Sequence, residues 1–223
     1  DGIMLVNAGV GIYPDNNLIT GNTIQNNTRA IWLVNGNYNK IINNAINDNE
    51  NGVYIFGDTD FNNITQNNIK GNYLGVSIID TSTNYNNFFN NLFVDNTNQA
   101  SDSGSNNYWN NSFIGNYWNN YDSEPEGCYD NDADLICDSP YNISGSAGNK
   151  DYLPSLGIQI QEITPIQVIP NVDLVKDKTT LVRITLKNSA MNNTNITVKL
   201  YFESSLKDSI DTTINAREEK DVD

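Results

Sequence analysis

Apolar positions recur through the first hundred residues with a period near 22. With Ile24 as an anchor, Ile46, Ile69 and Phe93 follow in matching surroundings, and Ile3 is expected to open the same column. Two further apolar columns lie seven and nine residues after the anchors: Val10, Ile31, Val53, Val76 and Ala100, then Ile12, Leu33, Ile55 and Ile78. Apolar pairs of period two indicate short strands, and a repeat of this length built from them predicts an all-β fold, a parallel β-helix of about five coils.

The repeat varies in length at one place only. The intervals from Leu33 to Ile41, Ile55 to Ile64 and Ile78 to Phe88 lengthen along the chain, whereas the other spacings hold. One corner of each coil is therefore predicted to be a surface loop that tolerates insertion.

About forty of the 223 residues are asparagine, and many of them fall into columns. The two clearest columns are Asn22, Asn44, Asn67 and Asn91, and Asn27, Asn49, Asn72 and Asn96. Asn tolerates the left-handed backbone region that tight corners need, and stacked Asn side chains can hydrogen-bond along the axis as a ladder. We expect these columns to be structural.

Trp32 and Tyr54 lie between inward positions on adjacent coils, so both are predicted to point outward, side by side. Such a pair can stack on a sugar ring, contact a neighbouring protein, or be a simple cross-strand pair.

The repeat is predicted to end near Asn107, because Asp102 occupies a core position and the stretch around it is polar. The following segment carries two Asn-Tyr-Trp-Asn-Asn copies, and its large side chains are expected to cover the open end of the helix. The expected cap residues are Trp109, Phe113, Trp118 and Tyr121.

An acidic loop follows the cap. Asp130, Asp132, Asp134 and Asp138 lie close together with no basic residue nearby, which predicts a structural Ca²⁺ site, with a solvated acidic loop as the alternative. Leu135 stands where loops of this kind usually carry glycine.

Cys128 and Cys137 bracket that loop and are the only cysteines in the chain. A disulfide is the favoured interpretation and predicts a location outside the cytoplasm, while reactive or metal-binding thiols are the alternatives.

After residue 157 the repeat vanishes, asparagine becomes less frequent, and alternating segments predict antiparallel strands near 159–169, 179–187 and 195–202, with turns at 170–171 and 191–194. We predict three regions: a β-helix over 1–107, a cap over 108–157, and an incomplete immunoglobulin-like β-sandwich over 158–223. Because the first coil and the sandwich both look truncated, the chain is expected to be part of a longer one.

The formal net charge is −15 and histidine is absent. Few basic residues argue against nucleic-acid binding, no apolar run is long enough to span a membrane, and mechanisms that use imidazole are excluded. Asn-x-Ser/Thr sequons predict glycosylation at Asn26, Asn63, Asn110, Asn142, Asn192 and Asn195.

The repeats, the ending Gly115-Asn-Tyr-Trp-Asn-Asn-Tyr121, the Asp-rich loop and Asp151-Tyr-Leu-Pro154 resemble the right-handed parallel β-helix repeat proteins related to the periplasmic copper-maturation family, of the type found among methanogen surface proteins. The resemblance implies that the β-helix is right-handed. The resemblance covers about residues 1–154. Residues 160–215 are similar to adhesion-related immunoglobulin-like domains. The resemblance implies an archaeal protein with an envelope or extracellular location, implies no catalysis, and suggests that the disulfide replaces part of the role of a metal.

The sequence therefore favours a non-catalytic structural or adhesive protein of a surface layer, sheath or filament, which associates with itself, with other envelope proteins or with glycans. The alternative is a carbohydrate-binding or polysaccharide-active protein, for which the loop residues Asp58, Asp60 and Asp80 offer carboxylates. Copper delivery is a poor third hypothesis, because histidine is absent and Met4 and Met191 are far apart in the sequence.

Overall fold

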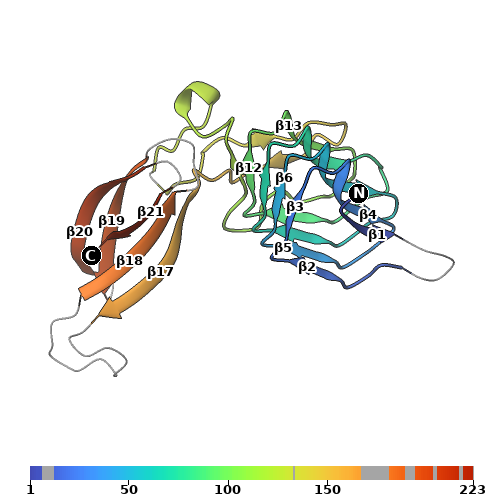
Figure 1. Ribbon diagram of the computed structural model, residues 1–223. Helices are drawn as coiled ribbons and strands as arrows, with labels where there is room; N and C mark the ends of the chain where they lie inside the picture. The colour runs from blue at the N-terminus through green and yellow to red at the C-terminus, as the bar shows by residue number, and fades with distance from the viewer. Residues whose placement is uncertain are drawn as a thin grey trace. The chain divides into compact units, whose positions relative to one another are not determined.

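A computed structural model describes residues 1–6, 13–132, 134–166, 181–188, 194–202, 205–215 and 218–222. The chain forms two compact units, Asp1–Leu156 and Gly157–Asp223. Figure 1 labels strands of both units.

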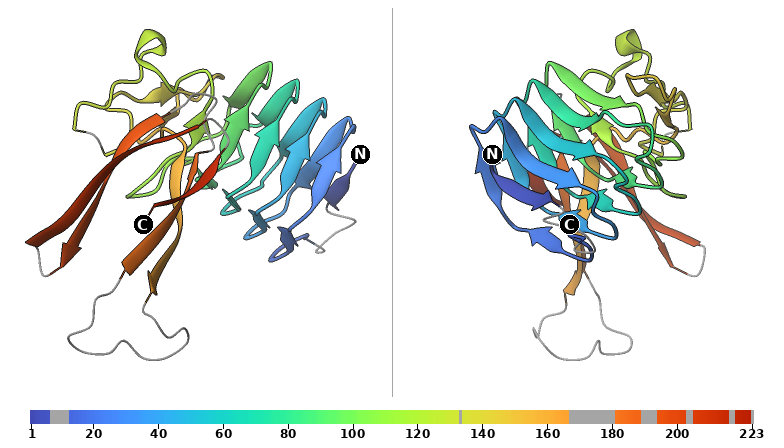
Figure 2. Two further views of the ribbon diagram at one scale, coloured as in Figure 1. Left: turned by 60° about the vertical axis from the view of Figure 1, so that its left-hand side comes forward. Right: turned by 90° about the vertical axis from the view of Figure 1, so that its right-hand side faces the viewer.

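The first unit is a stack of coils built from three parallel sheets (Figure 2). In spatial order, the first sheet contains β1 (Ile3–Val6), β4 (Arg29–Val34), β7 (Asn51–Phe56), β10 (Leu74–Ile78) and β13 (Asn98–Asp102). The second contains β2 (Leu18–Thr20), β5 (Lys40–Ile42), β8 (Asn63–Thr65) and β11 (Asn87–Phe89). The third contains β3 (Thr23–Gln25), β6 (Ala45–Asn47), β9 (Asn68–Lys70), β12 (Leu92–Val94) and β14 (Tyr117–Trp118). The predicted parallel β-helix is confirmed. Among the described residues four coils have all three strands, where about five coils are predicted.

The strand registers place equivalent apolar residues above one another. Ile24 pairs with Ile46, Ile46 with Ile69, and Ile69 with Phe93, as the repeat predicts, and Trp118 of the cap follows Phe93 in the same column. All five side chains are buried. The core is therefore a set of columns that run along the helix axis.

The prediction for Ile3 is wrong. Ile3 pairs with Ile31 and Leu5 with Leu33, so the first strand of the chain belongs to the first sheet and not to the anchor column. The period-two pair Ile3 and Leu5 matches the pair Ile31 and Leu33 and fits that sheet. Val10 and Ile12, which were assigned to these positions, lie outside the described residues.

Asparagine ladders run along the axis at three corners. Asn67 is fully buried, and its side-chain oxygen accepts hydrogen bonds from the backbone N–H and the side-chain amide of Asn44, both at 3.0 Å. Its own amide donates to Asn91 Oδ1 at 3.0 Å and to backbone carbonyl groups, including that of Ile41. The two predicted ladders are confirmed, and a third ladder, outside the predicted columns, consists of Asn17, Asn39, Asn62, Asn86 and Asn107.

The left-handed backbone positions are not those of the ladder residues. They belong to the residue directly before each one: Asn43, Gln66 and Asn90 have φ values of 56°, 57° and 55°. One residue therefore turns the chain, and the next satisfies the hydrogen bonds of the corner.

Aromatic rings close the C-terminal end of the stack. Trp109 stacks on Phe88 at 4.3 Å, and Trp118 stacks on Phe93 at 4.2 Å, measured between ring centroids. The prediction that Phe113 belongs to the cap core is wrong, because this side chain is 81% exposed. Asn111 Oδ1 accepts hydrogen bonds from the N–H groups of Phe113 and Ile114, which form a tight turn that leaves Phe113 at the surface.

Two buried carboxylates end two of the ladders. Asp151 accepts hydrogen bonds from the backbone and side-chain N–H groups of Asn116 and from Trp118 Nε1. Asp102 accepts from the side-chain amide of Asn107 and from Trp109 Nε1. Because an ionised carboxylate only accepts, it can terminate a row of donating amides without leaving a donor of its own unpaired.

The rest of the first unit is the cap region, with the 3-10 helix η1 (Glu124–Glu126) and the antiparallel pair β15 (Tyr141–Asn142) and β16 (Lys150–Asp151).

The second unit is antiparallel. One sheet contains β17 (Ile158–Ile166), β18 (Leu181–Asn188) and β21 (Glu219–Val222), and the other contains β19 (Thr194–Phe202) and β20 (Ser205–Ile214). Leu186 and Val222 of the first sheet and Ile214 of the second are buried in one cluster, so the two sheets share a core. The predicted turn at 170–171, and residues 191–193 of the other predicted turn, lie outside the described residues.

We expect Asn67→Ala to lower the free energy of unfolding by about 2–4 kcal/mol, because it leaves buried donors on Asn44 and buried carbonyl groups without partners. The neighbouring Asn68, which is exposed, is the control, and its change to alanine should cost less than about 0.5 kcal/mol. Urea unfolding measures both, and similar losses in the two variants would contradict a structural role for the ladder.

Burial raises the pKa of Asp151 to about 6, although the N–H groups of Asn116, Trp118 and Leu153 oppose this shift. Because this value lies above the unfolded value of about 3.9, the folded protein holds the proton more tightly, and this group's contribution to stability falls as the pH rises from about 4 to about 6. Relative to Asp151→Asn, the wild-type free energy of unfolding should fall by roughly 2–3 kcal/mol over that range. Parallel pH profiles for the two proteins would rule the shift out.

Candidate functional site

The disulfide between Cys128 and Cys137 forms as predicted, and both residues are buried. It closes a loop with a sequence separation of 9. The described residues contain no free cysteine, so the alternatives of a reactive or metal-binding thiol are not supported.

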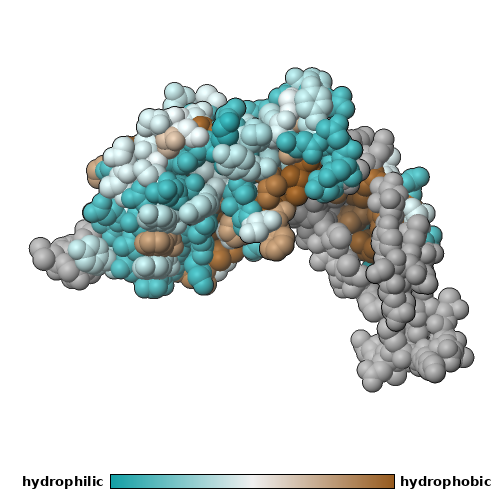
Figure 3. Space-filling model, turned by 180° about the vertical axis from the view of Figure 1, so that it is seen from behind, coloured by the Kyte–Doolittle hydropathy of each residue, from teal (hydrophilic) through white to brown (hydrophobic). Residues whose placement is uncertain are grey.

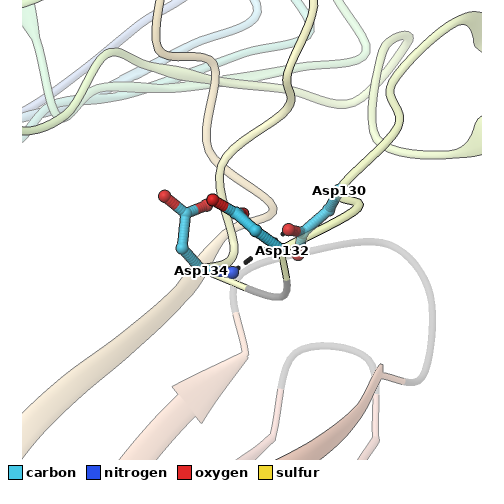
Figure 4. Close-up of side chains that lie close together, drawn as sticks. All are labelled: Asp130, Asp132 and Asp134. Carbon is cyan, nitrogen blue, oxygen red and sulfur yellow. Dashed lines mark hydrogen bonds between the residues drawn. The ribbon is translucent and has the colours of Figure 1, made fainter.

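Three of the four predicted acidic ligands come together inside this loop. Oxygen atoms of Asp130, Asp132 and Asp134 lie within 4.8 Å of one another (Figure 4). The carboxylate of Asp130 accepts hydrogen bonds from the backbone N–H groups of Asp134 and Leu135, both at 3.1 Å. Asp134 accepts from the N–H of Ile136 at 2.8 Å. Backbone donors therefore stabilise much of the negative charge in this cluster.

Asp138 does not join the cluster and is bonded to a different neighbour. Its carboxylate accepts hydrogen bonds from the backbone and side-chain N–H groups of Asn131. Leu135, between the two groups of acids, has a φ of 68°, so it takes the left-handed conformation that glycine usually supplies.

Trp32 and Tyr54 lie side by side on paired strands, with ring centroids 6.3 Å apart in an edge-to-face arrangement. The guanidinium of Arg29 lies over both rings, 4.5 Å from the centroid of Trp32 and 4.8 Å from that of Tyr54. Arg29 also forms an ion pair with Asp1 at 3.6 Å. The arginine covers ring surface that a sugar would need, although a contact role for this pair stays a prediction.

A second aromatic group, which the sequence interpretation missed, stands at the variable corner. Tyr38, Phe61 and Tyr85 form a continuous stack in which both neighbouring pairs have centroids 5.2 Å apart and planes 6° apart. We call these three residues the aromatic ladder. Each directly precedes an Asn of the third asparagine ladder, and that regular placement is the signal that could have revealed it.

Two of the three loop carboxylates of the enzymatic alternative accept hydrogen bonds within the fold. Asp60 Oδ1 accepts a hydrogen bond from the backbone N–H of Asn84, one coil further along, at 2.7 Å. Asp80 Oδ1 accepts from the N–H and hydroxyl groups of Ser82. Asp58 is exposed. The bonds of Asp80 hold its own turn, and the bond of Asp60 joins two adjacent coils.

The predicted glycosylation sites differ in accessibility. Asn26 and Asn142 are exposed, whereas Asn63 and Asn110 are half-buried and hydrogen-bonded to Asn87 and to Tyr152 respectively. Asn192 lies outside the described residues, and Asn195 lies in β19 with its side chain undescribed. Glycosylation stays a prediction at every site.

These features together define a parallel β-helix protein with a capped end and a disulfide-closed acidic loop. Residues 3–123 match the family described as Periplasmic copper-binding protein (NosD). The match spans more than half of the 223 residues, and the chain belongs to this family. Comparison with curated proteins and with solved structures finds no match.

The family is periplasmic, and the chain accordingly has an extracellular or envelope location. Among the helices of the described residues, none has the length and apolar character needed to cross a bilayer.

The prediction of bound Ca²⁺ at Asp130, Asp132, Asp134 and Asp138 is wrong. The family is described as copper-binding, not calcium-binding. The physical reason lies in the loop: backbone N–H groups provide the charge stabilisation that was assigned to a cation, and Asp138 is bonded elsewhere.

Copper does not fit the residues of this chain either. Proteins bind copper chiefly through imidazole, thiolate and thioether groups. The chain has no histidine, and its two cysteines are joined to each other. Of its two methionines, Met4 is exposed on β1 and Met191 lies outside the described residues. The chain thus has the fold of its family without a set of copper ligands.

Replacing both Cys128 and Cys137 with alanine should lower the free energy of unfolding by about 2–3 kcal/mol, because the disulfide restricts the unfolded chain. Wild-type protein in reductant should unfold like the double variant, and the double variant should not respond to reductant. Denaturant unfolding with and without dithiothreitol makes the comparison. A wild-type stability that reductant leaves unchanged, with reduction verified by thiol titration, would contradict this role.

Proposed function

We propose that the chain is a non-catalytic structural and adhesive protein of the cell surface, a component of a surface layer, sheath or filament that associates with itself and with other envelope proteins. The observation that carries this proposal is the set of three asparagine ladders, whose buried amides connect successive coils along the axis. Buried, fully paired amide networks hold a single arrangement of the backbone. The helix is thereby suited to act as a rigid spacer.

The chemistry of the side chains supports a non-catalytic role. Histidine is absent, and the buried acids Asp102 and Asp151 accept the hydrogen bonds that end the ladders. Of the three loop acids Asp58, Asp60 and Asp80, Asp60 accepts a hydrogen bond from the next coil and Asp80 accepts one within its own turn. A general acid or base must be placed to reach a substrate proton, and these groups are engaged within the fold.

The same proposal covers the second unit, glycosylation and the type of surface protein. The second unit has two antiparallel sheets around a shared core, which supports an immunoglobulin-like spacer domain. The exposed sequons at Asn26 and Asn142 support a glycoprotein. From the repeat pattern and its ending, we also infer that the chain is an archaeal surface protein of the methanogen type.

Purified full-length chain should form ordered sheets or filaments that are visible by negative-stain electron microscopy. The same material should release neither reducing ends nor unsaturated uronic acids from a panel of polysaccharides. Discrete monomers at all concentrations would count against assembly, and product formation with any polysaccharide would overturn the non-catalytic role.

A further inference from the structure

The aromatic ladder occupies backbone positions that do not suit aromatic residues. Tyr38, Phe61 and Tyr85 have φ values of 59°, 58° and 56°, in the left-handed region that residues other than Gly, Asn and Asp rarely adopt. The equivalent residues before the first and last Asn of the third asparagine ladder are Asn16 and Asn106, with φ values of 59° and 53°. The column therefore accepts asparagine readily, yet it carries three aromatic rings in its middle coils.

Burial does not account for these rings. Tyr38, Phe61 and Tyr85 are 55%, 43% and 41% exposed, so much of their apolar surface remains in water. Stacking between the rings offsets part of the backbone strain. Strained residues that gather at an exposed surface are characteristic of binding sites, where the strain persists because the side chains are needed.

The spacing of the rings indicates the kind of molecule that fits them. The planes of parallel rings in van der Waals contact are about 3.5–4 Å apart. The centroids of the ladder rings are 5.2 Å apart, so neighbouring rings are displaced sideways. Each ring therefore leaves part of one face uncovered by its neighbour. The result is a straight row of apolar steps, one for each coil. An extended β-1,4-linked glycan presents one pyranose ring per step at a closely similar repeat, and the apolar face of a sugar stacks on aromatic rings.

Charge narrows the ligand further. Asn37, Asp60 and Asn84 directly precede the three rings, and the side-chain oxygen of each accepts a hydrogen bond from a backbone N–H of the next coil, which fixes the backbone beside the rings. The formal net charge of −15 repels an acidic polysaccharide. The surface of the β-helix on the side drawn in Figure 3 is mainly hydrophilic.

We propose that the aromatic ladder binds a neutral β-1,4-linked glycan strand that lies along the axis of the β-helix. The inference rests on the proposed function, because it names the partner of an adhesive, non-catalytic surface protein. The proposed binding surface does not include Trp32 and Tyr54, because the guanidinium of Arg29 lies over both of their rings.

The test compares wild-type protein with the triple variant Tyr38→Asn, Phe61→Asn, Tyr85→Asn. Asparagine suits the left-handed positions, so the variant should fold, with an unchanged circular dichroism spectrum and a melting temperature no lower than wild type. The matched control changes two exposed aromatic residues outside the ladder to asparagine: Tyr73, 62% exposed, and Phe113, 81% exposed.

Isothermal titration with cellohexaose and with the hexamer of β-1,4-linked N-acetylglucosamine measures binding. We expect at least one of them to bind wild type, affinity to rise from the dimer to the hexamer, and the triple variant to lose at least tenfold in affinity while the control keeps it. Maltohexaose and oligogalacturonate should bind at least tenfold more weakly.

Three results would overturn the inference. The wild-type protein binds neither β-1,4-linked hexamer, or the control variant loses as much affinity as the triple variant. In the third, the triple variant loses self-association and the wild-type protein binds no glycan. The last would assign the ladder to contact with a second copy of the chain. Each leaves the non-catalytic role in place, whereas products released from the hexamers would overturn that role even if the ladder binds them.

Discussion

The structure depends on one recurring interaction, the hydrogen bonds of buried asparagine amides at the corners of each coil. A parallel β-helix turns its chain sharply between short strands, and backbone N–H and C=O groups at these turns have no strand partner. The side chain of Asn67 meets this need on both sides, because its oxygen accepts from the preceding coil and its amide donates to the next and to nearby carbonyl groups. No apolar residue of the same volume can do this, so the unusual composition follows from the architecture.

Each asparagine of a ladder donates a hydrogen bond to the next one, so the last asparagine needs another acceptor. In the cap, Asp102 and Asp151 provide it, because a carboxylate accepts several N–H groups and needs no acceptor beyond itself. The same carboxylates bind the indole N–H groups of Trp109 and Trp118, whose rings cover the last core residues. The cap thus closes the apolar core and the polar ladders with one set of residues.

At the variable corner, the surface residues can change while the core and the asparagine ladder stay the same. Residues are inserted early in this corner, while Asn39, Asn62 and Asn86 at its end stay in register and keep the ladder intact. The residues just before them are therefore presented in a straight row, whatever their identity. In this chain that row is aromatic, and the metal chemistry named by the family description has no matching ligand set. Function in such a fold resides in the residues displayed, not in the coil itself.

Periodicity in the sequence was enough to predict the β-helix, its core columns such as Ile24 to Phe93, and two asparagine ladders. The disulfide was predicted separately, from two cysteines that bracket one loop in a chain without other thiols. These are local or strictly repeated features, and identical surroundings in each coil make them visible along one dimension. The sequence could not show that Ile3 belongs to the first sheet, that Phe113 is exposed, or that the acids from Asp130 to Asp134 bind backbone N–H groups while Asp138 bonds to Asn131. It also did not reveal that Asp102 and Asp151, far apart in the chain, terminate neighbouring ladders, or that Tyr38, Phe61 and Tyr85 form one surface. Those outcomes depend on which groups from different coils meet in space, and only the folded chain determines those contacts.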